Sequence, residues 1–337
     1  KTFGDSTKNS ESPHMLATLR DNFNSAVETG LMNKDNRSAL DAIQSQIKLN
    51  ISKAPERIVT SIKNLCEVKR DMTPSLPPQR NQSATGWCYA FVAADLVSYK
   101  LGVNVSPIEM ALQYNLKHEL KASDEGGLPN KAIESSLPIG FCPSNGNEFL
   151  DTNAFMVHAV LPKLSEVDSL RDADDQQLCT GFHDISIFLK NLQWEEFRKI
   201  IRHSTSGNLL AELRNLSCKS RIFPPQPLVI KSGDYPDTYH NKSFAEQVLL
   251  SLSQGRPVGL GFNIQPFIIS TKGSPWHALV AVGNEKDPET GECKVILRNS
   301  WGTSCADFKA PMECNQGQLK IKFSDLEGLK IDTTEIE

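Results

Sequence analysis

One stretch constrains the fold more than any other part of this chain: residues 88–101 are apolar on nearly every face that a helix would present. The stretch ends at Gly102, and glycine commonly ends a helix because it adopts the left-handed backbone of a C-terminal cap. A helix with almost no polar face has to be covered on all sides. The sequence therefore predicts a central, buried helix at 88–101, around which other elements must pack.

A proline-rich stretch at residues 73–78 is the clearest boundary in the sequence, because proline ends helices. Through much of 14–69, apolar residues recur at spacings of three and four and predict helices there. We therefore expect a helical N-terminal extension over 1–70 and a separate domain over 71–337.

The last third of the chain has the pattern of strands. Short apolar runs begin at Pro257, and the run from Leu319 to Phe323 alternates apolar and polar residues, as a half-buried strand does. Residues 287–291 contain proline and glycine and predict a turn that joins two strands. These patterns predict an α+β fold in which a helical half precedes a β half, each contributing part of one site.

Composition excludes several classes of protein. The 337 residues carry a net charge of −4 and a pI of about 6.0, so the chain has no global basic field for nucleic acid. It has no run of ~18 uncharged apolar residues, so we expect no membrane span. No Cys-x-x-Cys pair occurs, and we expect neither a metal nor a cofactor. The chain starts at Lys1 without a signal-like segment, so we expect a processed or trimmed form.

The cysteine count permits two interpretations. If Cys88 is a free nucleophile, seven of the eight cysteines remain, and disulfides can use six of them. Cys305 and Cys314 flank a polar loop and are the candidate pair. The alternative is that most of these cysteines are buried thiols in a reducing compartment.

A glycine-bearing loop delivers a single cysteine to the start of the predicted central helix: Gly86 lies two residues before Cys88. The thiolate is the reactive form of cysteine, and a helix N-terminus lowers a thiol pKa through its dipole and free N–H groups. Gln82 lies six residues upstream. Its side-chain N–H and the backbone N–H of Cys88 could stabilise a developing oxyanion.

An imidazole and an amide follow far downstream. His277 opens a predicted strand and could take the thiol proton and hold the thiolate as an ion pair. Asn299 could accept from the imidazole N–H and fix its ring plane, while Trp301 covers that hydrogen bond from water. His158 is a rival, but no Asn-Ser-Trp sequence follows it at short range. Four of the other histidines lie in polar surroundings and are expected at the surface: His118, His183, His203 and His240.

Each of these residues also has a structural explanation. A lone cysteine or histidine next to an apolar run is usually a core residue, and a lone glutamine can cap a loop. Their order and local context together favour catalysis. Gly126 and Gly127 add an edge along which an extended peptide could bind through backbone hydrogen bonds.

With these motifs the chain resembles the papain family of cysteine peptidases. The similarity covers roughly 71–337 and lies in the spacing from Gln82 to Cys88, in His277-Ala278 with Gly283, and in Asn299-Ser300-Trp301-Gly302. It implies a two-lobed fold, with a helical lobe at about 71–222 and a β-barrel-like lobe at about 223–337. The segment between Cys88 and His277 is longer than is typical, which implies an insertion at about 142–222.

The resemblance also implies an activity and its residues. Cys88 is expected to be the nucleophile, His277 the acid and base, Asn299 the orienting residue and Gln82 the oxyanion donor in peptide hydrolysis through a thioester. Six further residues are expected to bind substrate, and two of them, Leu128 and Pro129, to favour an apolar second residue on the acyl side. The substrate-binding set is Gly86, Gly126, Gly127, Leu128 with Pro129, and Trp301.

The chain departs from the family at four positions. Tyr89 replaces a tryptophan, Thr85 replaces a cysteine, Trp87 replaces a small residue and is expected to narrow the cleft, and Trp276 replaces an Asp or Asn before the histidine. Gly86 without the usual cysteine beside it is also similar to the same loop in the bleomycin-hydrolase branch of the family, whose members are aminopeptidases with longer chains. We expect an endopeptidase in preference to an aminopeptidase.

The sequence leaves open the role of the N-terminal extension, the choice among three functions, and the location of the protein. Residues 1–70 lie where the family carries an inhibitory propeptide, but the usual propeptide signature is missing, so a zymogen and a structural extension are both compatible. An inactive papain-like binding or inhibitory protein and a thioester-using acyl transferase are the alternative functions. The cysteine count and the family's habits favour a secreted, periplasmic or lysosome-like location, and Asn81 begins a glycosylation sequon on the predicted oxyanion loop.

Overall fold

The computed structural model describes residues 65–82, 85–120, 126–144, 174–179, 193–203, 218, 220–234, 244–270, 275–327, 329 and 331–337. Most of the predicted N-terminal extension, the histidines at 158, 183 and 240, and much of the predicted insertion at 142–222 lie outside these residues.

The helices and strands follow the order expected from the sequence, with helices before most of the strands. The helices are α3 (Cys88–Leu101), α4 (Pro107–Lys117), α5 (Pro129–Ser136), α10 (Trp194–His203), α12 (Phe244–Ser253) and α13 (Phe323–Glu327). The described residues also form short 3-10 helices: η2 (Thr73–Ser75), η3 (Leu137–Ile139) and η4 (Gln265–Phe267). The strands are β1 (Arg70–Asp71), β2 (Ile230–Asp234), β3 (Val258–Asn263), β4 (Trp276–Lys286), β5 (Cys293–Arg298), β6 (Glu313–Asn315), β7 (Gln318–Lys322) and β8 (Ile331–Ile336).

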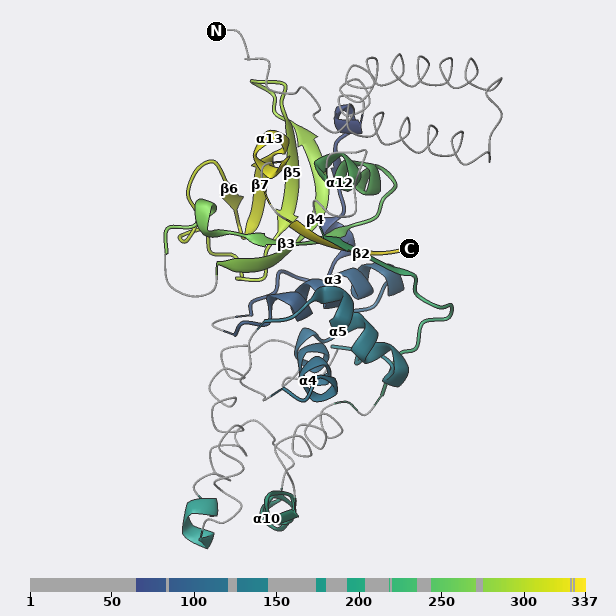
Figure 1. Cartoon of the computed structure of the whole chain (residues 1–337), viewed down its shortest axis with the longest axis vertical. Coiled ribbons are helices and arrows are strands. Elements are labelled where there is room, and N and C mark those ends of the chain that lie inside the picture. Colours follow the sequence, from purple (N-terminus) through teal and green to yellow (C-terminus); the bar gives the residue numbers. More distant parts are fainter. Residues whose placement is uncertain are drawn as a thin grey trace, which may run out of the picture. The chain divides into compact units, whose positions relative to one another are not determined.

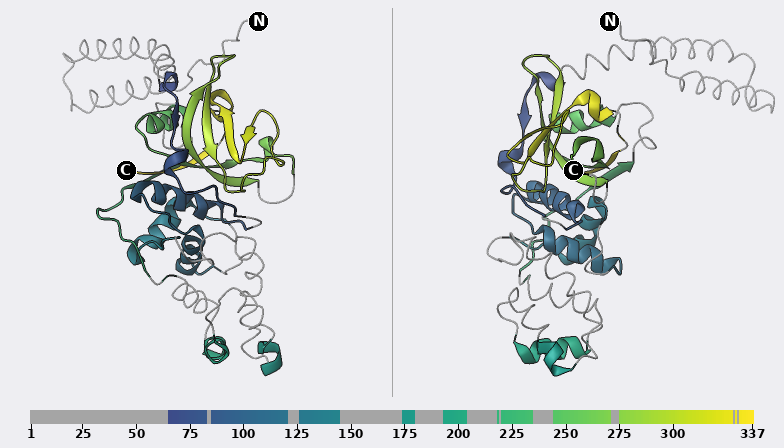
Figure 2. Two further views of the ribbon diagram at one scale, coloured as in Figure 1. Left: turned by 180° about the vertical axis from the view of Figure 1, so that it is seen from behind. Right: turned by 90° about the vertical axis from the view of Figure 1, so that its left-hand side faces the viewer.

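The strands form one antiparallel sheet in the order β2-β8-β3-β4-β5-β7-β6, with β1 paired to β4. Figures 1 and 2 show α3, α4 and α5 gathered on one side of this sheet. This combination of helices with an antiparallel sheet confirms the predicted α+β class. Among the described residues, none of the helices has both the length and the apolar character that crossing a membrane requires.

The central helix predicted from the sequence is confirmed at the predicted residues. Along α3, ten of the fourteen residues are buried, and they pack against α4, α5 and the sheet in one hydrophobic core. Gly102 has φ 65° and donates its backbone N–H to Ser98 O, as a left-handed C-terminal cap does. The burial of most of this helix follows from its composition, since it has almost no polar face to expose.

The strand predictions are confirmed for β3, β4, β5 and β7. Asp287 and its neighbours form the predicted turn between β4 and β5, where the Asp287 carboxylate accepts from the N–H groups of Glu289 and Thr290. The run ending at Phe323 stops one residue early, because Phe323 begins α13. Strands β1, β2, β6 and β8 were not predicted. Of these, β8 pairs with both β2 and β3 and thereby extends the sheet beyond β3.

Three disulfides join described cysteines: Cys66–Cys293, Cys142–Cys218 and Cys305–Cys314. The predicted bridge between Cys305 and Cys314 is confirmed, as is the use of six cysteines in bridges. Cys88 and Cys179 are not disulfide-bonded. The Cys66–Cys293 bridge connects the segment before β1 to the first residue of β5.

Candidate active site

Cys88 is the first residue of α3, and Trp87 is the N-cap. The cap supplies no side-chain hydrogen bond, so the first turn of the helix keeps backbone N–H groups directed toward its N-terminus. The Cys88 side chain is partly buried against the hydrophobic core and takes no part in a disulfide. These features give the thiol a position at the positive end of a fourteen-residue helix dipole.

His277 and Asn299 are brought together by the sheet, as the sequence predicted. His277 is the second residue of β4, and Asn299 directly follows β5, the strand beside it. His277 Nε2 lies 2.8 Å from Asn299 Oδ1. Because an amide oxygen only accepts, Nε2 carries the proton and Nδ1 is left as an acceptor.

Aromatic rings cover this hydrogen bond. The rings of Trp301 and His277 have centroids 4.3 Å apart, and Phe308 stacks on Trp301 with centroids 5.4 Å apart. The side chains of His277 and Asn299 are almost fully buried. Trp301 therefore lies where the sequence placed it, against the imidazole whose hydrogen bond it was expected to shield.

Burial determines the protonation of the imidazole. It lowers the pKa of His277 from its ordinary value of 6.5 to about 4, and the hydrogen bond that the imidazole donates to Asn299 only partly opposes this effect. At neutral pH the imidazole is therefore neutral. A neutral imidazole with an available Nδ1 lone pair is the form that can accept a proton from a thiol.

The loop that carries Gln82 is hydrogen-bonded along its length to the loop that carries Asn299. The backbone N–H of Gln82 donates to Ser300 O at 2.6 Å, and that of Gly302 donates to Arg80 O at 2.9 Å. The Gln79 side chain donates to Asn299 O. These bonds hold residues 79–82 against residues 299–302.

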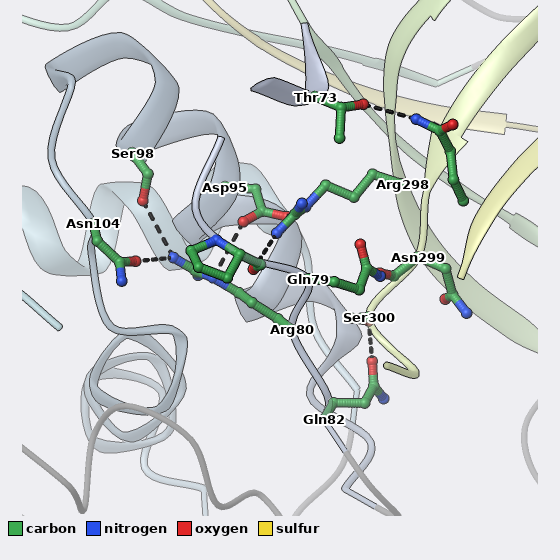
Figure 3. Close-up of polar contacts among 12 residues, drawn as sticks. Thr73, Gln79, Arg80, Gln82, Asp95, Ser98, Asn104, Arg298, Asn299 and Ser300 are labelled. Atoms are coloured by element: carbon green, nitrogen blue, oxygen red, sulfur yellow. Dashed lines mark hydrogen bonds and ion pairs between the residues drawn. The ribbon is translucent and has the colours of Figure 1, made fainter. Parts of the chain in front are cut away.

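The Gln82 amide is held at both ends. Its oxygen accepts from the Ser300 hydroxyl, and its nitrogen donates to Thr85 O at 2.6 Å (Figure 3 shows the bond to Ser300). An amide nitrogen carries two protons, and Thr85 O accounts for one of them. Gln82 is thus a buried amide with a fixed orientation, three residues before the turn that leads to Cys88.

The glycines expected to bind substrate lie side by side. Gly126 donates its N–H to Gly86 O at 3.0 Å, which brings the loop before α5 next to the loop before α3. A Cβ on Gly127 would lie 2.9 Å from the rings of Tyr89 and Tyr114, so the backbone passes too close to these rings for any side chain. The side chain of Leu128 is 45% exposed, whereas Pro129 is buried as the first residue of α5.

The bulky residues that depart from the family pattern differ in their surroundings. Tyr89 is fully buried, and its hydroxyl donates to Asn115 Oδ1 at 3.2 Å. Trp87 is 1% exposed and belongs to the hydrophobic core, so the expectation that it narrows a cleft is wrong. Trp276 is 51% exposed.

Several residues around these loops were missed by sequence reasoning. Asp95 on α3, Arg80 and Arg298 form a buried ionic cluster between the helix, the loop at 78–82 and β5 (Figure 3). A carboxylate inside an otherwise apolar helix was the available signal, since buried charges are usually paired. Ser300 belongs to the predicted Asn-Ser-Trp-Gly motif, but the motif does not predict its hydrogen bond to Gln82.

Comparisons with known proteins give similarity in three dimensions only. No family model matches the sequence, and no curated protein is similar to it. The chain is similar to the ragweed pollen allergen cysteine protease Amb a 11 in its proform, at 13% identity over 79% of this chain and 65% of that one, with a TM-score of 0.42. It is similar to procathepsin L2 from the Tenebrio molitor larval midgut, at 14% identity over 75% and 67%, with a TM-score of 0.38. It is also similar to the bromelain protease of Ananas comosus, at 14% identity over 80% and 97%, with a TM-score of 0.40.

Proposed function

We propose that this chain is a cysteine-type peptidase that hydrolyses peptide bonds through a thioester on Cys88. The observation that carries the proposal is the buried hydrogen bond of 2.8 Å between His277 and Asn299, beneath Trp301. The Asn299 loop is bonded along its length to the loop that leads into Cys88. A thiol at a helix N-terminus and an imidazole oriented by an amide are the parts that thiol catalysis requires.

In the proposed reaction, Cys88 is the nucleophile and His277 transfers the protons. His277 Nδ1 takes the Cys88 proton, and the thiolate attacks the carbonyl carbon of the scissile peptide bond. As the tetrahedral intermediate collapses, His277 donates that proton to the leaving nitrogen, and the C–N bond breaks. Water then attacks the thioester with His277 as base, which releases the acid and restores the thiol.

The developing oxyanion would be stabilised by the second N–H of the Gln82 amide and the backbone N–H of Cys88. Support for this role comes from the fixed orientation of Gln82 between Thr85 and Ser300. Pre-oriented donors cost no reorganisation at the moment of reaction, and the loss of one costs about 2.7–4 kcal/mol of transition-state stabilisation.

An extended peptide or protein substrate would lie along the paired loops at Gly86 and Gly126. Gly127 keeps the backbone free of a side chain there, and the exposed Leu128 offers an apolar surface to a neighbouring substrate residue. Main-chain hydrogen bonds to such an edge bind peptides with little regard to sequence, while side-chain contacts give selectivity. This arrangement suits an endopeptidase better than an aminopeptidase, since an edge binds internal segments.

We further infer an oxidising location, secreted, periplasmic or lysosome-like, because three disulfides join described cysteines. Residues 1–70 are proposed to act as a propeptide of a zymogen.

Labelling with a peptide epoxide that targets active-site thiols tests the proposal on the full chain and on a form that starts at Leu65, with Cys88→Ala as the control. The shorter form keeps Cys66 and its bridge to Cys293, and it should be labelled faster than the full chain if the N-terminal residues inhibit. Labelling confined to Cys88, together with turnover of a fluorogenic peptide, is the expected result. Cys179 is exposed and not disulfide-bonded, so its labelling serves as an internal measure of ordinary thiol reactivity. If Cys88 reacts no faster than Cys179 in both folded forms, the protein is an inactive binding protein instead. Amide exchange without hydrolysis would identify an acyl transferase.

A further inference from the structure

Asp95 is a buried carboxylate that the catalytic scheme does not use. It lies on α3 seven residues after Cys88, which is two helical turns, so the two residues are on the same side of the helix about 10 Å apart along its axis. Its side chain is 6% exposed. Asp95 therefore belongs to the same rigid element as the proposed nucleophile.

Two arginines from different parts of the chain meet at this carboxylate. Arg298 Nε lies 2.7 Å from Asp95 Oδ2, and Arg80 Nε lies 3.3 Å from Asp95 Oδ1. The two arginine side chains are 3% and 9% exposed. Figure 3 shows Asp95 between them. One carboxylate thus compensates two buried guanidinium groups.

Each arginine lies within two residues of a residue of the proposed site. Arg298 directly precedes Asn299 and also donates to Pro78 O at 2.8 Å. Arg80 precedes Gln82 by two residues and donates to Asn104 Oδ1 at 2.6 Å and to Val105 O at 2.8 Å. The arginine side chains therefore connect both loops of the site to the helix that carries Cys88.

We propose that Asp95 is a positioning residue, which through Arg298 and Arg80 fixes Asn299 and Gln82 relative to Cys88. The inference rests on the proposed function, since it concerns the geometry of that site. Asp95 contacts neither substrate nor reacting atoms in this scheme. It acts by holding three segments in register, and a misplacement of about 1 Å can cost about 100-fold in rate.

The chain offers a matched control. Glu109 on α4 is likewise a fully buried carboxylate paired with an arginine, Arg221, at 2.9 Å, and Arg221 also donates to Gly140 O. Neither member of this pair is next to a residue of the proposed site. Asp95→Asn and Glu109→Gln each remove one buried negative charge from an ion pair with arginine. The arginines paired with Asp95 lie in the loops of the proposed site, whereas the arginine paired with Glu109 does not.

The experiment measures both variants in a Cys179→Ser background, so that Cys88 is the one thiol open to alkylation among the described cysteines. The first readout is the pH dependence of Cys88 alkylation by iodoacetamide, which reports the thiolate without requiring turnover. The second is kcat and KM on a fluorogenic peptide, and the third is the Tm. We expect Asp95→Asn to shift the alkylation profile toward that of an ordinary thiol and to lower kcat about 100-fold with little change in KM, because the geometry acts in the transition state.

The other variants show whether Asp95 positions the site or only stabilises the fold. Glu109→Gln is expected to lower the Tm while the alkylation profile and kcat stay unchanged, and Asp95→Glu to restore part of the profile because it keeps the carboxylate. If Asp95→Asn does not fold, Arg298→Lys replaces it, since lysine keeps the charge but loses one of the two contacts. An alkylation profile and kcat that are the same in the parent, in Asp95→Asn and in Arg298→Lys would overturn the inference alone. Ordinary thiol reactivity in the parent itself would overturn the proposed function as well.

Discussion

Ser300 donates its hydroxyl proton to the side-chain oxygen of Gln82, so the residue that follows the orienting asparagine also orients the proposed oxyanion donor. Both side chains are buried. Two adjacent residues thus orient two side chains of the site. Asn299 orients the ring of His277, and Ser300 orients the amide of Gln82.

Ser300→Ala is expected to lower kcat about fivefold, since the net value of one hydrogen bond is about 1 kcal/mol. KM should change little, because the Gln82 amide acts on the transition state. Steady-state kinetics on a peptide substrate measure the effect. Ser253→Ala, which removes a hydroxyl bonded to Leu250 O on α12, is the matched control. Equal kcat values for the two variants would contradict the role of Ser300.

His277 is expected to make stability depend on pH. Its folded pKa of about 4 lies below the unfolded value of 6.5, so the unfolded state binds more protons between these values. The stability contributed by the neutral imidazole is therefore complete above pH 6.5 and is lost as the pH falls toward 4, by an amount on the order of 3 kcal/mol. Urea unfolding of Cys88→Ala should show this loss, and Cys88→Ala/His277→Gln should lack it. Parallel curves for the two proteins from pH 7 to 4 would refute the assignment.

Gly127→Ala is expected to destabilise the fold by about 1–3 kcal/mol, the usual cost of an overpacked site. The added Cβ meets the ring of Tyr89, which is buried, and the ring of Tyr114, which is partly buried, at 2.9 Å. Chemical denaturation measures the loss. Gly261→Ala is the control within a regular element, because a Cβ there meets its nearest atom at 3.6 Å. A loss no larger than that of the control would show that the rings move aside at no cost.

Leu128→Asp is expected to lower kcat/KM about tenfold for peptides with an apolar second residue on the acyl side, while the Tm stays near that of the parent. Leu128 is 45% exposed, so its replacement removes little from the core. Val229→Asp changes a residue of similar exposure, 52%, outside the proposed substrate edge. A substrate library profile dominated by charged residues at that position would argue against the apolar surface.

Removal of the Cys305–Cys314 bridge by Cys305→Ser/Cys314→Ser is expected to cost about 3 kcal/mol, the loop-closure entropy of a short cross-linked segment. The bridged loop contains Phe308, which stacks on Trp301. We therefore expect the variant to lose activity before it unfolds on heating. Activity that declines only in step with unfolding would disconnect the bridge from the site.

The sequence identified the parts of the fold that local chemistry determines. The helix at 88–101 could be predicted because its apolar composition and Gly102 are local signals, and the turn at Asp287 for the same reason. The catalytic motifs were found because their residues lie close together within each motif. Whether Cys88, His277 and Asn299 catalyse a reaction stays a prediction.

The rest depends on contacts that no local pattern reveals. Strand β8 contains the polar run Asp332-Thr333-Thr334-Glu335, and it becomes a strand because β2 and β3 lie on either side of it. Asp95 and Arg298 are 203 residues apart in the sequence, and a charged residue in an apolar helix does not name its partner. The arginines that hold the site together could therefore be recognised only in three dimensions.

The bridge between Cys66 and Cys293 has a consequence for any proteolytic maturation of the chain. Lys69 and Arg70 are exposed basic residues on the C-terminal side of Cys66. A cut after either of them separates the backbone but leaves the first fragment attached to β5 through sulfur, as a two-chain protein that comes apart only when a reductant is added. Release of the N-terminal residues by hydrolysis alone requires a cut before Cys66. The position of one half-cystine thus decides whether a trimmed N-terminus departs or stays as a covalently bound light chain.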